Sequence, residues 1–133
     1  MITPAIHFPG KCAEAIELYK KAFDVTVNSI SYYRDAPPNS GMPDTADIQN
    51  LVMHSDLTIC GTRVNMADYT KEVTVGDMIM LNVFLDSAED VRKAYHVLLD
   101  GGTVETELGP QFWSELYGSV IDRFGVRWQL MVE

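Results

Sequence analysis

The sequence has only two cysteines, Cys12 and Cys60, and they lie far apart with no CxxC spacing. That arrangement argues against a disulfide scaffold and favours a reduced, cytoplasmic protein with two free thiols. No apolar run approaches the roughly 20 residues that a membrane-spanning helix needs. The first ten residues also lack a basic segment followed by a long apolar stretch, so we expect no signal peptide.

Basic residues are scarce as well, because 10 Lys and Arg stand against 19 Asp and Glu, for a formal net charge of −9. Nucleic acids and anionic membrane surfaces require basic patches, so neither is expected as a partner. The charge leaves room for a cationic ligand, although a well-charged soluble surface is the simpler explanation. The hydrophobic fraction of 47% over 133 residues fits one globular domain.

The apolar periodicity predicts an element order that occurs twice. Strands are expected at residues 3–8, 25–33, 50–60, 63–67, 78–85, 103–108, 117–121 and 126–132. Helices are expected at residues 12–23 and from the residue after Ser87, a candidate N-cap, to the Gly101-Gly102 stop. Loops are expected at residues 34–47, 68–76 and 109–113. The order is therefore βαβββ followed by βαβββ.

Weak internal matches favour a duplication behind this order. Residues 13–14 match residues 88–89 at an offset of 75. At an offset of 64, the matching pairs are Ser55 with Ser119, Leu57 with Ile121, Gly61 with Gly125, and Arg63 with Arg127. The offsets differ because the first half carries a longer loop.

The last strand has two chemically different faces. Val126, Trp128, Leu130 and Val132 alternate with Arg127, Gln129 and Met131. Gly125, just before this strand, can adopt the positive φ that a tight turn often needs. An apolar face against helices and a second face with an arginine and an amide indicate a lined cavity.

Three segments carry a family resemblance: residues 12–23 (CAEAIELYKKAF), 52–54 (VMH) and 122–128 (DRFGVRW). Together they resemble the PhnB-like branch of the vicinal oxygen chelate superfamily, the glyoxalase/bleomycin-resistance/dioxygenase fold. The resemblance covers the whole chain and implies an α+β domain, residues 1–133, with two βαβββ modules at about 1–70 and 77–133. It further implies that the sheets curl around a cavity and that the protein is a homodimer. PhnB-like proteins are sometimes labelled demethylubiquinone methyltransferases, but no glycine-rich loop for adenosylmethionine is visible.

In metal-using relatives, four ligands come from the first and last strands of each module. Alignment by strand ends puts these slots at Pro4, Asn65, Met80 and Gln129. Proline has no side-chain donor, thioether sulfur is a soft ligand, and neutral amides lack the charge of carboxylates. We therefore expect no metal and no other cofactor. A shift of three residues would bring in His7, but alternation places His7 off the face of Pro4, Ile6 and Phe8.

Alternation also predicts the residues of a ligand-binding cavity, with apolar walls and a few polar groups. The cavity residues are Ile6, Phe8, Arg63, Asn65, Met80, Asn82, Phe84, Arg127, Gln129 and Met131. The resemblance further implies that Trp113, Glu115 and Tyr117 flank the mouth of the cavity. Asn65 and Gln129 could instead bond each other, and Trp113 could pack against a dimer partner. Rim salt bridges are expected for Arg63 and Arg127; if they point inward, they favour an anionic group on the ligand.

His54 is the one candidate for proton transfer, and it should share the cavity face with Val52. The alternative is a hydrogen-bonded histidine that closes the sheet. The preferred function is a metal-independent protein that binds a small organic molecule, with catalysis unproven. A drug-sequestering protein of the bleomycin-resistance type and a metalloenzyme of the glyoxalase or lyase type remain alternatives.

Overall fold

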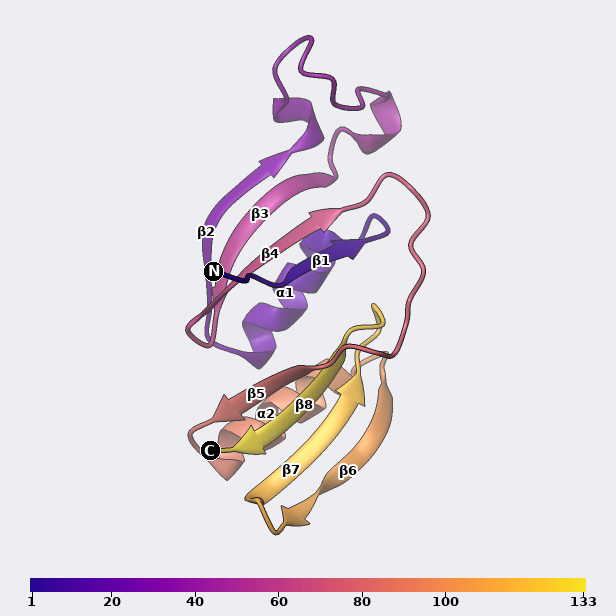
Figure 1. The fold of residues 1–133 in the computed structure, drawn as a ribbon. Coiled ribbons are helices and arrows are strands. Elements are labelled where there is room, and N and C mark those ends of the chain that lie inside the picture. Colours follow the sequence, from indigo (N-terminus) through magenta and orange to yellow (C-terminus); the bar gives the residue numbers. More distant parts are fainter. The chain divides into compact units, whose positions relative to one another are not determined.

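The computed structural model describes residues 1–133 as two units, each built on one four-stranded mixed sheet (Figure 1). The first unit comprises Met1–Glu17 and Asp24–Thr74, and the second comprises Leu18–Phe23 and Val75–Glu133. The first helix therefore contributes residues to both units. Neither helix has the length and apolarity required to cross a membrane.

The two units repeat the same element order. The first contains β1 (Ala5–Phe8), α1 (Cys12–Ala22), β2 (Val25–Tyr32), the 3₁₀ turns η1 (Tyr33–Asp35) and η2 (Ala46–Ile48), β3 (Val52–Ile59) and β4 (Thr62–Asp68). The second contains β5 (Leu81–Leu85), α2 (Ala88–Leu99), β6 (Thr103–Gln111), β7 (Ser114–Ile121) and β8 (Arg127–Val132). This confirms the predicted βαβββ repeat.

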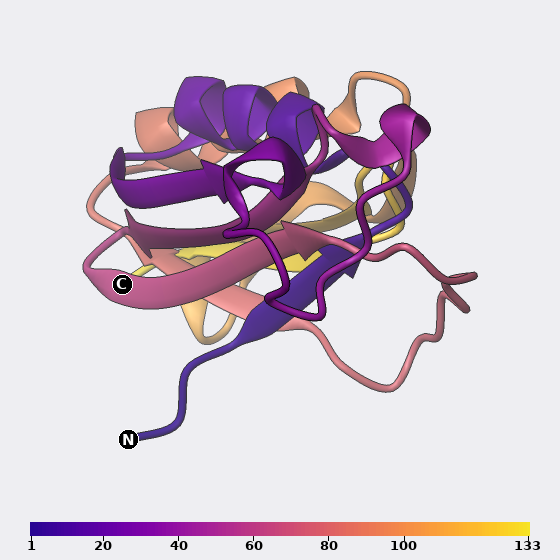
Figure 2. The ribbon, with the colours of Figure 1, turned by 90° about the horizontal axis from the view of Figure 1, so that it is seen from above.

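Strand pairing is also the same in both sheets. The orders are β1-β4-β3-β2 and β5-β8-β7-β6. The first strand of each sheet runs parallel to the last strand, and the remaining pairs are antiparallel. Figure 2 shows α1 lying against one face of the first sheet.

Local sequence explains the second helix well. The Ser87 side chain accepts a hydrogen bond from the Asp90 backbone N–H at 3.1 Å, which is N-cap geometry. Its buried residues have helical spacing and face the sheet: Val91, Ala94, Tyr95 and Leu98. The chain turns away at Gly101, whose φ of 73° is the left-handed conformation typical after a helix.

A buried carboxylate joins the ends of three elements in the first unit. Asp68, 3% exposed at the end of β4, accepts hydrogen bonds from the Cys12 N–H at 2.8 Å and the Val52 N–H at 2.9 Å. The Tyr33 hydroxyl donates to the Asp68 backbone carbonyl at 3.0 Å. The start of α1 and the start of β3 are thus both fixed to the last residue of β4.

Two element predictions need correction. Residues 109–113 were expected to be a loop, but β6 continues to Gln111 through bulges that keep it paired with β7. The strand expected to begin at residue 78 begins at Leu81, after a segment in which Met78 and Ile79 are 93% and 76% exposed. Their apolar character suggested a strand, but the ladder with β8 begins only at the Leu81–Trp128 pair.

The register corrects part of the proposed repeat alignment. Asn65 pairs with Asp56, whereas Gln129 pairs with Ser119, so Asp56 and not Ser55 is the counterpart of Ser119. The last strands keep an offset of 64 and the middle strands have 63. The hairpin between β7 and β8 is one residue longer than the Cys60-Gly61 turn, which explains the difference.

Candidate functional site

A helix packs against one face of each sheet. No helix packs against the other face, which we call the open face. In β8 the helix side is formed by Trp128 and Leu130, which are 2% and 0% exposed. Arg127 and Gln129 alternate with them and are half-buried. The predicted two-faced pattern of the last strand is therefore present in the structure.

A buried aspartate fixes the hairpin that leads into β8. Asp122 is 3% exposed, and one carboxylate oxygen accepts from the Tyr19 hydroxyl at 2.6 Å and Trp128 Nε1 at 2.9 Å. The other accepts from the backbone N–H groups of Phe124 and Val126 at 2.9 and 3.0 Å. Gly125, within this turn, has the expected positive φ, at 93°. These bonds hold the start of β8 and therefore position its open-face side chains.

On the open face of the second sheet, side chains form rows across the strands. One row is polar and joins Asn82, Gln129, Ser119 and Thr106. The next row is apolar and aromatic, and it joins Phe84, Met131 and Tyr117. Gln129 Nε2 lies 3.0 Å from the Met80 sulfur, so its amide oxygen is left as an acceptor toward the face.

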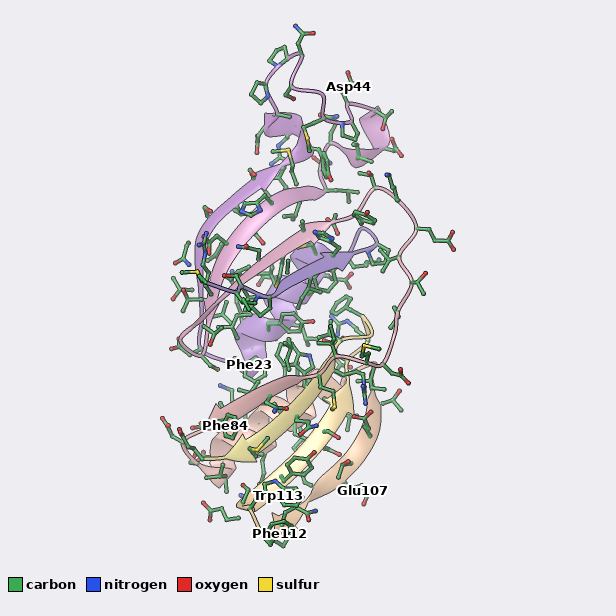
Figure 3. The ribbon with its side chains drawn as sticks, viewed as in Figure 1. Phe23, Asp44, Phe84, Glu107, Phe112 and Trp113 are labelled. Carbon is green, nitrogen blue, oxygen red and sulfur yellow. The ribbon has the colours of Figure 1, made fainter.

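Aromatic rings extend the apolar row toward the β6–β7 turn. Trp113 packs edge-on against Tyr117 with ring centroids 5.3 Å apart, and Phe112 packs against Trp113 at 4.8 Å. Phe84 and Trp113 are 54% and 51% exposed. Figure 3 labels Phe84 on β5 and Trp113 with Phe112 at the turn. Half-exposed rings next to a polar row offer stacking and hydrogen bonding together.

Arg127 lies at the edge of the polar row and is fully engaged. Its guanidinium pairs with the Glu105 carboxylate and donates to the Asp77 backbone carbonyl. It also borders a pocket of about 400 Å³ between residues 75–77 and the β7–β8 hairpin. Arg63 likewise pairs with Asp56, with Nη2 2.8 Å from Oδ2. Both arginines thus make the salt bridges that the sequence favoured.

The first sheet places Arg63 and Asn65 on its open face, but Phe8 lies elsewhere. Ala5 pairs with Asn65, whereas Phe8 pairs with Asp68, whose carboxylate caps α1. Phe8 is 1% exposed and belongs to the helix side, as does Ile6. Their predicted place on the cavity face is therefore wrong, because the alternation was anchored one residue out of phase.

The same register moves His7 onto the open face. His7 pairs with Ala67 and stacks on Tyr69, with ring centroids 5.1 Å apart and planes 3° from parallel. Alternation had been expected to exclude it.

His54 is exposed on β3, and no hydrogen bond holds its imidazole. Val52, expected beside it, is 0% exposed and belongs to the helix side, because the pairing of β2 with β3 slips by one residue between the two. Asp56 lies on the same face, two residues along the strand. Proton transfer by His54 remains a prediction.

The four slots used for metal in related folds do not fit a divalent ion. The Pro4 carbonyl accepts the Asn65 backbone N–H at 2.9 Å, and Met80 and Gln129 contact each other through sulfur and amide nitrogen. No three His, Cys, Asp or Glu side chains converge anywhere in the structure. A thioether and neutral amides are a poor donor set for zinc, magnesium or nickel. We therefore assign no step to a metal.

Three residues of these open faces were not predicted from sequence: Asp56, Glu105 and Ser119. Ser119 follows from alternation in β7 once its pairing with β8 is known. Glu105 and Asp56 are recognisable only by their arginine partners, which lie 22 and 7 residues away.

The duplicated βαβββ units define a vicinal oxygen chelate protein with the glyoxalase/bleomycin-resistance fold. A fosfomycin resistance protein, FosX, from Listeria monocytogenes has this fold, with a TM-score of 0.67 at 8% identity over 98% of this chain and 91% of that chain. More narrowly, the family model described as 3-demethylubiquinone-9 3-methyltransferase matches residues 1–131, and the chain belongs to this family.

Proteins of closer sequence agree with this assignment and confirm the PhnB-like resemblance. The chain is 28% identical to protein YjdN of Escherichia coli, over 98% of this chain and 94% of YjdN. It is 27% identical to the PhnB protein of Bacillus cereus, with a TM-score of 0.82 over 99% and 98% of the two chains. Protein PA1353 of Pseudomonas aeruginosa has the same identity and a TM-score of 0.85 over 100% and 97%.

Proposed function

We propose that the protein binds a small organic molecule on the open face of β5-β8-β7-β6 and that no metal ion takes part. The supporting observation is the pairing of the Asn82 and Gln129 amides beside half-exposed aromatic rings. Small-molecule sites typically combine apolar walls with a few convergent polar groups.

The role of each side chain follows from its free hydrogen-bonding groups or its exposed ring surface. The Gln129 amide oxygen and the exposed Asn82 amide bond polar groups of the ligand. Phe84 and Trp113 stack on a flat apolar part. Arg127 is already neutralised by Glu105, so the ligand needs no anionic group. We therefore expect an uncharged ring compound with a hydrogen-bond donor.

The family description names a methyltransferase, and we do not extend that activity to this chain. Nothing in the open faces or in the glycine positions supports a site for adenosylmethionine. Methyl transfer from adenosylmethionine to any quinol by the purified protein would contradict a role limited to binding.

A fragment screen by ligand-observed NMR, run on metal-free protein in EDTA, tests the proposal. Binding fragments should quench tryptophan fluorescence, because Trp113 is half-exposed whereas Trp128 is buried. Gln129→Ala should weaken binding about tenfold, the loss of one well-placed hydrogen bond. Gln49→Ala, in the loop of the first unit, is the matched control and should bind normally. Fragments that bind only after zinc or nickel is added, or equally well to Gln129→Ala, would refute the proposal.

A further inference from the structure

The middle of the first sheet carries a charged group that the second sheet lacks. Across the open face of the first sheet, one row joins Ala5, Asn65, Asp56 and Ser29. The register makes this row the counterpart of Asn82, Gln129, Ser119 and Thr106. An amide occupies the last strand in both rows. Only the first row has a carboxylate, at Asp56, next to that amide.

The hydrogen bonding of Asp56 is one-sided. Oδ2 accepts from Arg63 Nε at 3.0 Å and lies 2.8 Å from Nη2. Oδ1 is buried and accepts no hydrogen bond, and it is the single buried side-chain atom of the structure in that condition. The nearby Asn28 amide donates instead to the Thr58 hydroxyl at 3.0 Å. A carboxylate has room for about four donors, so Asp56 has unused capacity.

Asp56 is charged at neutral pH. The hydrogen bond from Arg63, against an opposing contribution from burial, lowers the pKa of the Asp56 carboxyl, and the positive charges of Arg63 and His54 add to the effect. An ionised oxygen without a donor is costly, and a charged donor satisfies it best.

The Arg63 side chain, which covers the Asp56 carboxylate, can also move away from it. The Arg63 side chain is 51% exposed, whereas that of Asp56 is 19% exposed. An exposed ion pair of this kind contributes little to stability, so its separation does not open the core. Asn65, the neighbour of Asp56 on β4, donates through Nδ2 to the Ser55 carbonyl at 3.4 Å, and its amide oxygen is left as a second acceptor.

We propose that Asp56 and Asn65 form a binding site for the primary ammonium group of a small molecule, which takes the place of Arg63 on the Asp56 carboxylate. An ammonium has three donors, enough for both Asp56 oxygens and the Asn65 amide oxygen. All of its residues belong to the first sheet, so it does not depend on the site proposed on the second sheet.

The test is a titration of ¹⁵N-labelled protein with benzylammonium, with uncharged benzyl alcohol as the matched probe. Saturable shifts are expected at the backbone amides of Asp56, Asn65 and Ser29 with the amine only. Asp56→Asn, which preserves shape, should weaken binding about tenfold or more. Arg63→Gln should strengthen it about threefold or more, because the competing cation is gone.

Asp100 and Arg123 form another aspartate–arginine pair, 3.6 Å apart, and provide matched controls. Asp100→Asn and Arg123→Gln should leave amine binding unchanged. The proposal is overturned if Asp56→Asn binds as well as the unmodified protein, or if Arg63→Gln binds more weakly. It is also overturned if benzylammonium shifts no residue of the first sheet. Shifts confined to the Asn82 and Gln129 amides would contradict the site at Asp56 and Asn65 but not the site proposed on the second sheet.

Discussion

Replacement of Asp122 by asparagine tests whether one carboxylate holds the last hairpin in place. The change removes the charge and turns one of two acceptor oxygens into a donor. The Asp122 carboxylate accepts four hydrogen bonds, from the Tyr19 hydroxyl, Trp128 Nε1, and the N–H groups of Phe124 and Val126. Whichever way the new amide is turned, its NH₂ group faces two former donors. At about 1.5–3 kcal/mol for each bond to a charged group, the loss of two predicts about 3–6 kcal/mol.

Urea denaturation followed by tryptophan fluorescence measures this loss, because Trp128 is buried beside the carboxylate. Asp100→Asn is the matched control, since the Asp100 side chain is 81% exposed and its pair with Arg123 should contribute less than about 1 kcal/mol. Tyr19→Phe removes a single donor and should fall between the two variants. A cost below about 1 kcal/mol for Asp122→Asn would refute the reasoning.

Other variants test the packing around the sheets. Gly102→Ala should destabilise the fold by about 3 kcal/mol or more, because the new Cβ would lie 2.4 Å from the Ile121 carbonyl oxygen. In the control Gly109→Ala, the new Cβ meets no atom within 4 Å, so the cost should be small. Thermal unfolding of the two variants measures the difference. Burial, and to a smaller extent the Asp68 carboxylate, raises the pKa of the Cys12 thiol to about 12. At pH 8 a disulfide reagent should therefore label one thiol per folded chain, that of Cys60. Two fast-reacting thiols per chain would contradict this prediction. The folded Cys12 thiol keeps its proton where the unfolded thiol, with a pKa of 9.0, loses it. Stability should therefore fall from about pH 9 to 12, by at most about 1.4 kcal/mol per pH unit, and Cys12→Ala should remove that part of the slope.

The fold followed from sequence because its signals are local. Alternation in residues 126–132, the Ser87 cap and the Gly101 stop each depend on a few neighbouring residues, and each is present in the structure. The duplicated order and the family resemblance of three segments then indicated the fold class. The contact between Asp122 and Tyr19 could not be predicted in this way, because the two residues lie 103 positions apart in the sequence.

The site was harder to predict because strand alternation has no absolute phase. β1 has four residues and no flanking turn that fixes which side chains face the helix. A slip of one residue exchanges every side chain between the two faces. Anchoring the pattern on Pro4 therefore placed Phe8 on the wrong face and excluded His7 from the open face, where the register puts it. In β8 the long Trp128–Leu130–Val132 series removed that ambiguity, so Arg127 and Gln129 were placed correctly.

Comparison of the two sheets leads to one more prediction. Arg63 and Arg127 occupy equivalent positions, yet Arg63 pairs with Asp56 in the middle strand and Arg127 with Glu105 in the outer strand. Ser119, the counterpart of Asp56, is 1% exposed. Ser119→Asp should therefore bury a carboxylate whose natural partner is occupied, at a cost of about 3 kcal/mol or more.

Adding Glu105→Gln to Ser119→Asp should return part of that stability, because it frees Arg127 for the new carboxylate. In a double-mutant cycle by urea denaturation, we expect a favourable coupling of about 1 kcal/mol or more. Glu107→Gln, a substitution on the same strand at a residue that makes no ion pair, is the control and should show no coupling. Additive effects of Ser119→Asp and Glu105→Gln would mean that the arginines, although equivalent in register, do not reach equivalent neighbours. The contrast between Asp56 and Ser119 would then carry no information about what each sheet binds.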